Sequence, residues 1–191
     1  MTVFWKKGYE GASLSDLTTA MGINAPSLYA AFGSKEGLFK AVLERYDARR
    51  SGFMERVLSA DDAYGVARNY LEGIAEFAAD TNGGANPPGC LLVQNGSCSD
   101  ATIPEEVARH RAEKERLLCE RFDQARKDGD LPRDADPSTL ARYLSAMANG
   151  ICMHAAAGAT VAELMEIAQM ALASWPMQAK AVKKKKPQAA A

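Results

Sequence analysis

Hydroxyl and amine side chains recur on two short helices predicted near the N-terminus and at the start of a third helix. Ser13 and Ser15 begin the first helix, Tyr29 lies on the second, and Ser34 and Lys35 begin the third. Such groups bind phosphate, and the free N–H groups of a helix N-terminus also favour anions. Taken singly, each has a simpler explanation, because Ser13 and Ser34 suit helix caps and Lys35 suits a solvated side chain. Together they predict a surface that binds a nucleic-acid backbone.

A second group of side chains on the middle helix is placed to meet base edges. Ala25 and Pro26 offer only apolar contact, for example to a thymine methyl group, and Ser27 discriminates weakly between bases. Asn24 is better explained as the helix cap. Direct readout is therefore expected to be modest and supplemented by DNA shape and by the spacing of a dimer.

Local signals position these side chains on two helices joined by a tight turn. Ser13 and Asp16 form a capping-box pair, and Gly22 suits the left-handed position that ends a helix. The next helix, 26–32, is too short to be stable alone and has Pro26 in its first turn. A helix-turn-helix presents a short helix to the major groove in this way, although other helical proteins also join two helices by a Gly turn.

Three segments carry a specific resemblance, namely FWKKGYEG, LSDLTTAMGI and PSLYAAFGSKEGLF. They resemble the N-terminal signature of the TetR family of transcriptional repressors, closely over 3–46 and more loosely over 88–176. The resemblance implies an all-α, TetR-like fold. It has a three-helix DNA-binding domain at 1–48, a helical ligand-binding and dimerisation domain at 49–176, and a disordered basic tail at 177–191. It also implies a homodimer that binds a double-stranded DNA operator and is released by a small-molecule inducer.

The N-terminus departs from that family's pattern. MTVFWKKGY supplies only about the last two turns of the family's first helix, with Val3, Phe4 and Tyr9 as inward residues. We therefore expect the genomic sequence upstream of Met1 to read in frame into a basic amphipathic segment, which an in-frame stop codon directly before Met1 would rule out. The alternative function is a helical ligand-binding or interaction dimer that has lost DNA binding.

Charge divides unevenly along the 191 residues, whose net charge is −1. Residues 1–50 carry a balance of +2 and residues 51–179 a balance of −8, with five further basic residues in the tail. This asymmetry favours a head that faces phosphate. The sequence contains no apolar run of membrane-spanning length and no secretory signal, so we expect a cytoplasmic protein with no membrane contact.

Helical periodicity recurs through the rest of the chain. It predicts helices at about 34–58, 60–79, 104–127, 137–157 and 160–175, with a loop at 81–89 and a short helix in CLLVQNG. The last two helices carry more apolar surface than one core needs, which favours a dimer interface. Simple internal burial is the alternative.

An apolar ligand pocket is expected inside the body, with an ordinary closed core as the alternative. No catalytic triad, phosphate loop or metal-ligand cluster is apparent, and His110 and His154 are isolated in the sequence. We therefore expect no enzyme, cofactor or metal. The candidate pocket residues are Tyr70, Ile74, Phe77, Leu91, Phe122, Tyr143, Met147, Cys152 and Trp175.

Two of the four cysteines are candidate redox sensors. The run GCLLVQNGSC, with Cys90 and Cys98, resembles the start of the ligand domain in TetR-type repressors of electrophile-detoxifying reductases, where a reactive cysteine follows a Gly-Cys-Leu run at the same spacing. The resemblance predicts that Cys98→Ser abolishes the loss of DNA binding caused by a mild electrophile or hypochlorite. A buried inert Cys90 and an incidental Cys98 are the alternative.

Overall fold

The computed structural model describes residues 1–81, 83, 86–96, 98–99 and 102–176. These residues form ten helices and no strand, which confirms the all-α prediction. None of the described helices is long and apolar enough to cross a membrane. The predicted basic tail at 177–191 lies outside the described residues.

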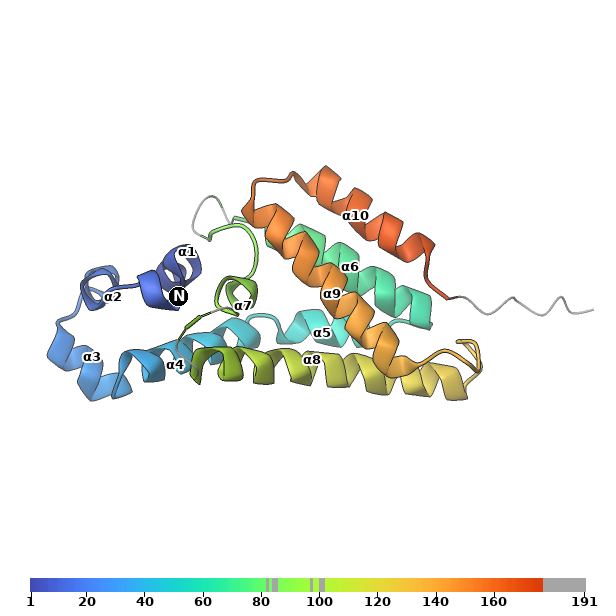
Figure 1. The fold of residues 1–191 in the computed structure, drawn as a ribbon, viewed down its shortest axis with the longest axis horizontal. Coiled ribbons are helices and arrows are strands. Elements are labelled where there is room, and N and C mark those ends of the chain that lie inside the picture. Colours follow the sequence, from blue (N-terminus) through green and yellow to red (C-terminus); the bar gives the residue numbers. More distant parts are fainter. Residues whose placement is uncertain (82, 84–85, 97, 100–101, 177–191) are drawn as a thin grey trace, which may run out of the picture.

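Figure 1 shows a small head at one end of the molecule and a larger helical body beside it. The head contains α1 (Thr2–Gly11), α2 (Leu14–Met21) and α3 (Ala25–Phe32), and α4 (Lys35–Ala48) leads from it to the body. The body contains α5 (Ser51–Leu58), α6 (Ala63–Ala79), α7 (Leu91–Gln94), α8 (Thr102–Lys127), α9 (Pro137–Ala156) and α10 (Val161–Ala173).

The prediction of a single helix at 34–58 is wrong, because this segment forms two helices, α4 and α5. The break falls at Arg50, whose backbone has φ −109° and ψ 0°. The Arg50 side chain is only 7% exposed, and its guanidinium lies 4.3 Å from the centre of the Phe77 ring. Apolar periodicity continues on both sides of the break, so the pattern alone does not reveal a turn that buries one arginine.

Side-chain caps set the starts of α6 and α10. Asp62 accepts a hydrogen bond from the Gly65 N–H at 2.6 Å, so α6 begins at Ala63 rather than at residue 60. Thr160 and Glu163 form a capping box at the start of α10. The helix expected to open at Pro104 begins two residues earlier, at Thr102.

An aromatic cluster anchors α1 on α4. Phe4 is fully buried, and its ring centre lies 5.1 Å from that of Phe39. Tyr9 packs on the same Phe39 ring at 5.3 Å. Trp5, not among the expected inward residues, is also buried and packs edge-on against Tyr46. The helical dihedrals of α1 are interrupted at Gly8, where φ is +70°.

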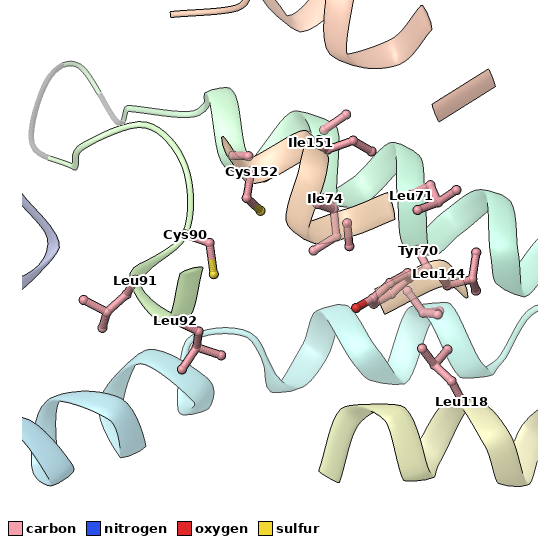
Figure 2. Close-up of a cluster of buried hydrophobic side chains, with 14 of the residues drawn as sticks. Tyr70, Leu71, Ile74, Cys90, Leu91, Leu92, Leu118, Leu144, Ile151 and Cys152 are labelled. Carbon is pink, nitrogen blue, oxygen red and sulfur yellow. The ribbon is translucent and has the colours of Figure 1, made fainter. Parts of the chain in front are cut away.

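The core of the body forms where α6 and α8 pack against α9, with α10 lying on α6 and α9. Figure 2 shows part of this core, with Tyr70 and Ile74 from α6, Leu118 from α8, and Leu144 and Ile151 from α9. One side of α9 and α10 remains open. Among the described residues it exposes Met153, Val161 and Met170, and Met170 is 76% exposed.

Candidate nucleic-acid interface and body cavity

The predicted capping box at the start of α2 is confirmed. The Asp16 N–H donates to Ser13 Oγ at 3.0 Å, and the Ser13 N–H donates to the Asp16 carboxylate at 3.0 Å. The Lys7 ammonium lies 2.6 Å from the same carboxylate. Lys7 and Ser13 together lower the pKa of Asp16 to about 2. Gly22, at φ +65°, then ends α2 and directs the chain into α3.

Helix α3 presents an exposed face between two fixed ends. The Ser27 N–H donates to Asn24 Oδ1 at 2.9 Å, so Asn24 is the cap that the sequence indicates. Leu28 is fully buried and holds the helix on the head, while Tyr29 is 44% exposed. Pro26 and Ser27 are also exposed, and Ala25 is half-buried. The residues expected at base edges therefore lie on or beside one accessible surface.

The candidate phosphate ligands flank α3 on neighbouring helix starts. The Gly37 N–H donates to Ser34 Oγ at 2.9 Å, which makes Ser34 the cap of α4. The Lys35 ammonium lies 4.6 Å above the Tyr9 ring, so a cation–π contact holds this side chain against α1. Ser15 is exposed in the first turn of α2. Their roles in binding phosphate stay predictions.

A cavity of about 860 Å³ opens in the body between α5, α6, α8 and α9. Its volume is typical of small-molecule sites. Tyr70, Ile74 and Cys152, from the expected pocket set, line it. Burial raises the pKa of Tyr70 to about 12, so its phenol stays protonated at neutral pH.

The other expected pocket residues lie elsewhere. Phe122 packs on Trp175 with ring centres 5.2 Å apart. The Tyr143 hydroxyl donates to the Ala171 carbonyl at 3.0 Å, which ties α9 to α10. Phe77 and Leu91 pack in the core near α1, and Met147 is half-buried on α9. None of these lines this cavity, which takes three of the nine candidate residues.

Cys90 lies in a polar cluster at one end of the cavity. Figure 2 shows Cys90 on the segment before α7 and Cys152 on α9. The Tyr46 hydroxyl donates to Cys90 Sγ at 3.2 Å, and Arg50 Nη1 donates to the Tyr46 oxygen at 3.1 Å and lies 4.0 Å from the sulfur. The Cys152 thiol is a further hydrogen-bond partner of the Cys90 sulfur. This bond, with the Arg50 charge and the Tyr46 hydroxyl, holds the pKa of Cys90 well below its usual value, although burial opposes the shift.

The neighbouring thiol responds in the opposite direction. The hydrogen bond to Cys90 and burial raise the pKa of Cys152. The two pKa shifts are therefore opposite in direction, so the thiolate form is favoured at Cys90 rather than at Cys152. Cys98 is half-buried.

Sequence reasoning missed Arg50 as a site residue. One signal was available, because Arg50 follows Tyr46 by four residues and so continues the stripe of Phe39, Val42 and Tyr46. A basic residue on an apolar stripe indicates either a side chain that reaches solvent or a buried charge with a function.

Comparison with known proteins identifies relatives over most of the chain. Residues 1–42 match the family model described as bacterial regulatory proteins, tetR family. The chain is 34% identical to the HTH-type transcriptional repressor ComR of Escherichia coli K12 over 181 residues, which cover 92% of this chain and 85% of ComR.

Solved structures agree with that match. A cysteine mutant of the TetR family regulator CifR, complexed with a 26 bp double-strand operator DNA, is 35% identical with a TM-score of 0.85, and the match covers 92% of each chain. The reduced form of E. coli NemR superposes with a TM-score of 0.72 at 20% identity over 88% of each chain, which shows the shared fold alone.

Proposed function

This chain belongs to the TetR family of bacterial regulatory proteins, and from that premise we propose a homodimeric transcriptional repressor. A small molecule in the body, or modification of a cysteine there, releases it from its operator. The observation that carries the proposal is the capped helix-turn-helix, which keeps Pro26, Ser27 and Tyr29 exposed on α3. The names of the relatives support it, since ComR is a repressor and the CifR complex contains operator DNA.

In this proposal the head at 1–48 divides its contacts between backbone and bases. Tyr29, Lys35 and the helix starts at Ser13, Ser15 and Ser34 bind phosphate. The α3 residues Ala25, Pro26 and Ser27 meet base edges in the major groove. Because none of these three side chains forms a bidentate pair with a base, phosphate contacts supply most of the affinity.

The alternative of a dimer without DNA binding has less support. The family model covers residues 1–42, and ComR is matched over 85% of its length. The short α1 is also packed, with Phe4 fully buried against α4. A repressor of this kind acts on chromosomal DNA, so we place it in the cytoplasm.

The body at 49–176 supplies the dimer contact and the sensor. The interface is the open side of α9 and α10, within the predicted segments 137–157 and 160–175, where Met153, Val161 and Met170 are exposed. The sensor is the cavity with Cys90 at one end, and Cys98 remains a second candidate thiol. A ligand or modification acts by favouring the state in which the two heads no longer fit adjacent half-sites.

The test is a mobility-shift titration with DNA flanking the chain's own gene, at several salt concentrations. We expect a steep fall of affinity with salt, because each phosphate contact releases counterions. Lys35→Gln is expected to weaken binding and to reduce the salt slope by about one contact. The matched control is Lys127→Gln at the far end of α8, which should change neither. Equal affinity for unrelated DNA, or binding insensitive to salt, would contradict the proposal.

A further inference from the structure

A buried cation lies at the wall of the body cavity without a carboxylate partner. Arg50 is 7% exposed and lines the cavity. Aromatic rings surround its guanidinium, with Phe77 at 4.3 Å, Tyr46 at 5.4 Å and Phe53 at 5.6 Å. No carboxylate of the described residues forms an ion pair with it. Burying a charge in this way is costly unless an anion compensates it.

The acidic residues around the cavity are already paired with other cations or face solvent. Asp47 binds His110 and also Lys114, whose ammonium lies 2.7 Å away. Glu113 lies 2.8 Å from Arg116, and Glu115 lies 3.6 Å from Arg142. Glu55, the remaining acid on the wall, is exposed. The acids of the wall therefore do not pair with Arg50, which leaves the Cys90 sulfur, 4.0 Å from Arg50 Nη1, as the group that can offset its charge among the described residues.

A second guanidinium lies at the same end of the cavity. Arg111 Nη2 donates to the Leu92 carbonyl at 2.9 Å, but the buried Arg111 Nε has no hydrogen-bond partner among the described residues. Arg50 and Arg111 both act electrostatically on Cys152. One end of the cavity is thus positively charged, while Phe53, Met54 and Leu58 give the rest an apolar wall.

From these contacts we propose that the cavity binds an amphipathic organic acid, with its carboxylate paired to Arg50 and its apolar part along α5 and α6. Arg111 supplies a second donor at the carboxylate end. The inference rests on the proposed function only in taking this ligand as the inducer. Binding itself takes place in the body and is measured on the full chain without DNA.

The Cys90 thiolate and the bound acid compete for Arg50. When ionised, the Cys90 sulfur is the negative group 4.0 Å from Arg50 Nη1. A carboxylate at Arg50 repels that thiolate and raises the pKa of Cys90. By linkage, ionisation of Cys90 weakens acid binding by the same factor. A neutral ligand of equal shape shields Cys90 sterically but does not change the pH at which it ionises.

The first measurement is calorimetric titration of the full chain, without DNA, with straight-chain acids from hexanoate to dodecanoate and with the matching primary amides. We expect at least one acid to bind roughly tenfold or more tightly than its amide, because charged hydrogen bonds are worth more than neutral ones. Arg50→Gln should abolish this preference. Arg109→Gln is the matched control, since Arg109 lines the cavity but is exposed and paired with Glu106.

Arg50→Lys distinguishes loss of the charge from a folding defect. It keeps the charge and should retain part of the preference for the acid over the amide. The second measurement is the pH dependence of Cys90 alkylation by iodoacetamide, which should shift upward with the acid and not with the amide. Equal binding of acids and amides, no binding of any acid, or an unchanged preference in Arg50→Gln would overturn the inference. Operator binding that persists in those cases leaves the proposed function standing, whereas acid binding without operator binding overturns the proposed function alone.

Discussion

Cys90 and Cys98 lie eight residues apart, and the surroundings of Cys90 stabilise a thiolate. Cys90 receives a hydrogen bond from Tyr46 and lies near the Arg50 charge, at the wall of the cavity. A thiolate reacts with electrophiles far faster than a thiol. Access through the cavity and a lowered pKa therefore favour Cys90 as a reactive residue.

The residue-scale prediction compares two serine variants. N-ethylmaleimide is expected to release the unmodified protein and Cys98→Ser from operator DNA, but not Cys90→Ser. The alkylation rate at neutral pH should fall about tenfold or more in Cys90→Ser, since each unit of pKa changes the thiolate fraction tenfold. Intact mass after brief treatment measures the modification, and a mobility shift measures release. If Cys98→Ser alone loses the response, the sequence-based assignment is correct.

Local contacts were predictable at this scale, and distant ones were not. Ser13, Asn24 and Ser34 were identified as caps because each bonds a backbone group three residues away. The contact of Arg50 with Cys90 joins residues 40 positions apart, and no local pattern encodes it. The tertiary fold alone determines that these two side chains meet.

At the scale of elements, α7 connects the cavity to the head. Its N-terminal cap is Cys90. At its other end the Tyr9 N–H of α1 donates to Asn95 Oδ1 at 2.6 Å, and Asn95 Nδ2 donates to the Leu91 carbonyl at 2.8 Å. A change at Cys90 that moves this four-residue helix therefore acts directly on α1. The same change acts on α4 through the hydrogen bond that the Tyr46 hydroxyl donates to Cys90 Sγ.

Gly89 lets the chain before α7 pass close to α9. Its φ is +90°, its N–H donates to the Ala78 carbonyl at 2.7 Å, and a Cβ there would lie 2.9 Å from the Cys152 carbonyl. Gly89→Ala is expected to destabilise the fold by about 1–3 kcal/mol and to weaken the bond between Cys90 and Cys152. Urea unfolding measures the loss of stability. The weaker hydrogen bond should appear as a shift of Cys90 alkylation to higher pH.

Gly158→Ala is the control for backbone strain alone. Gly158 has φ +97°, and a Cβ there would meet nothing within 4 Å. We expect a similar or smaller loss of stability and no change at Cys90. If both variants leave the alkylation profile unchanged, the close approach at Gly89 does not position Cys90.

The elements themselves were largely predictable, apart from the break between α4 and α5. Periodicity and caps located α2, α3, α6, α9 and α10 to within about three residues. The pocket was harder to place. Apolar residues on every helix satisfy the same pattern, and only packing decides which of them line a cavity and which, like Phe122 and Trp175, fill the core.

At the scale of the whole molecule, the open side of α9 and α10 must determine how two heads are spaced. A dimeric helix-turn-helix protein binds half-sites about one helical turn, roughly 34 Å, apart. The interface is therefore part of the DNA-binding mechanism as well as of stability. Helix α9 also lines the cavity, so in the proposed function a ligand bound there would change the spacing of the heads without touching DNA.

Met170→Glu tests this arrangement, because it places a charge where the partner subunit would bury an apolar side chain. Met170 is 76% exposed in the single chain. We expect the dimer to dissociate at least about tenfold more readily, since an unpaired buried charge costs several kcal/mol. Light scattering after size exclusion measures the mass, and operator affinity should fall with it. Met21→Glu makes the same change at a methionine of the head that is 41% exposed, and should leave the dimer intact. A dimeric Met170→Glu protein with full operator affinity would place the interface elsewhere.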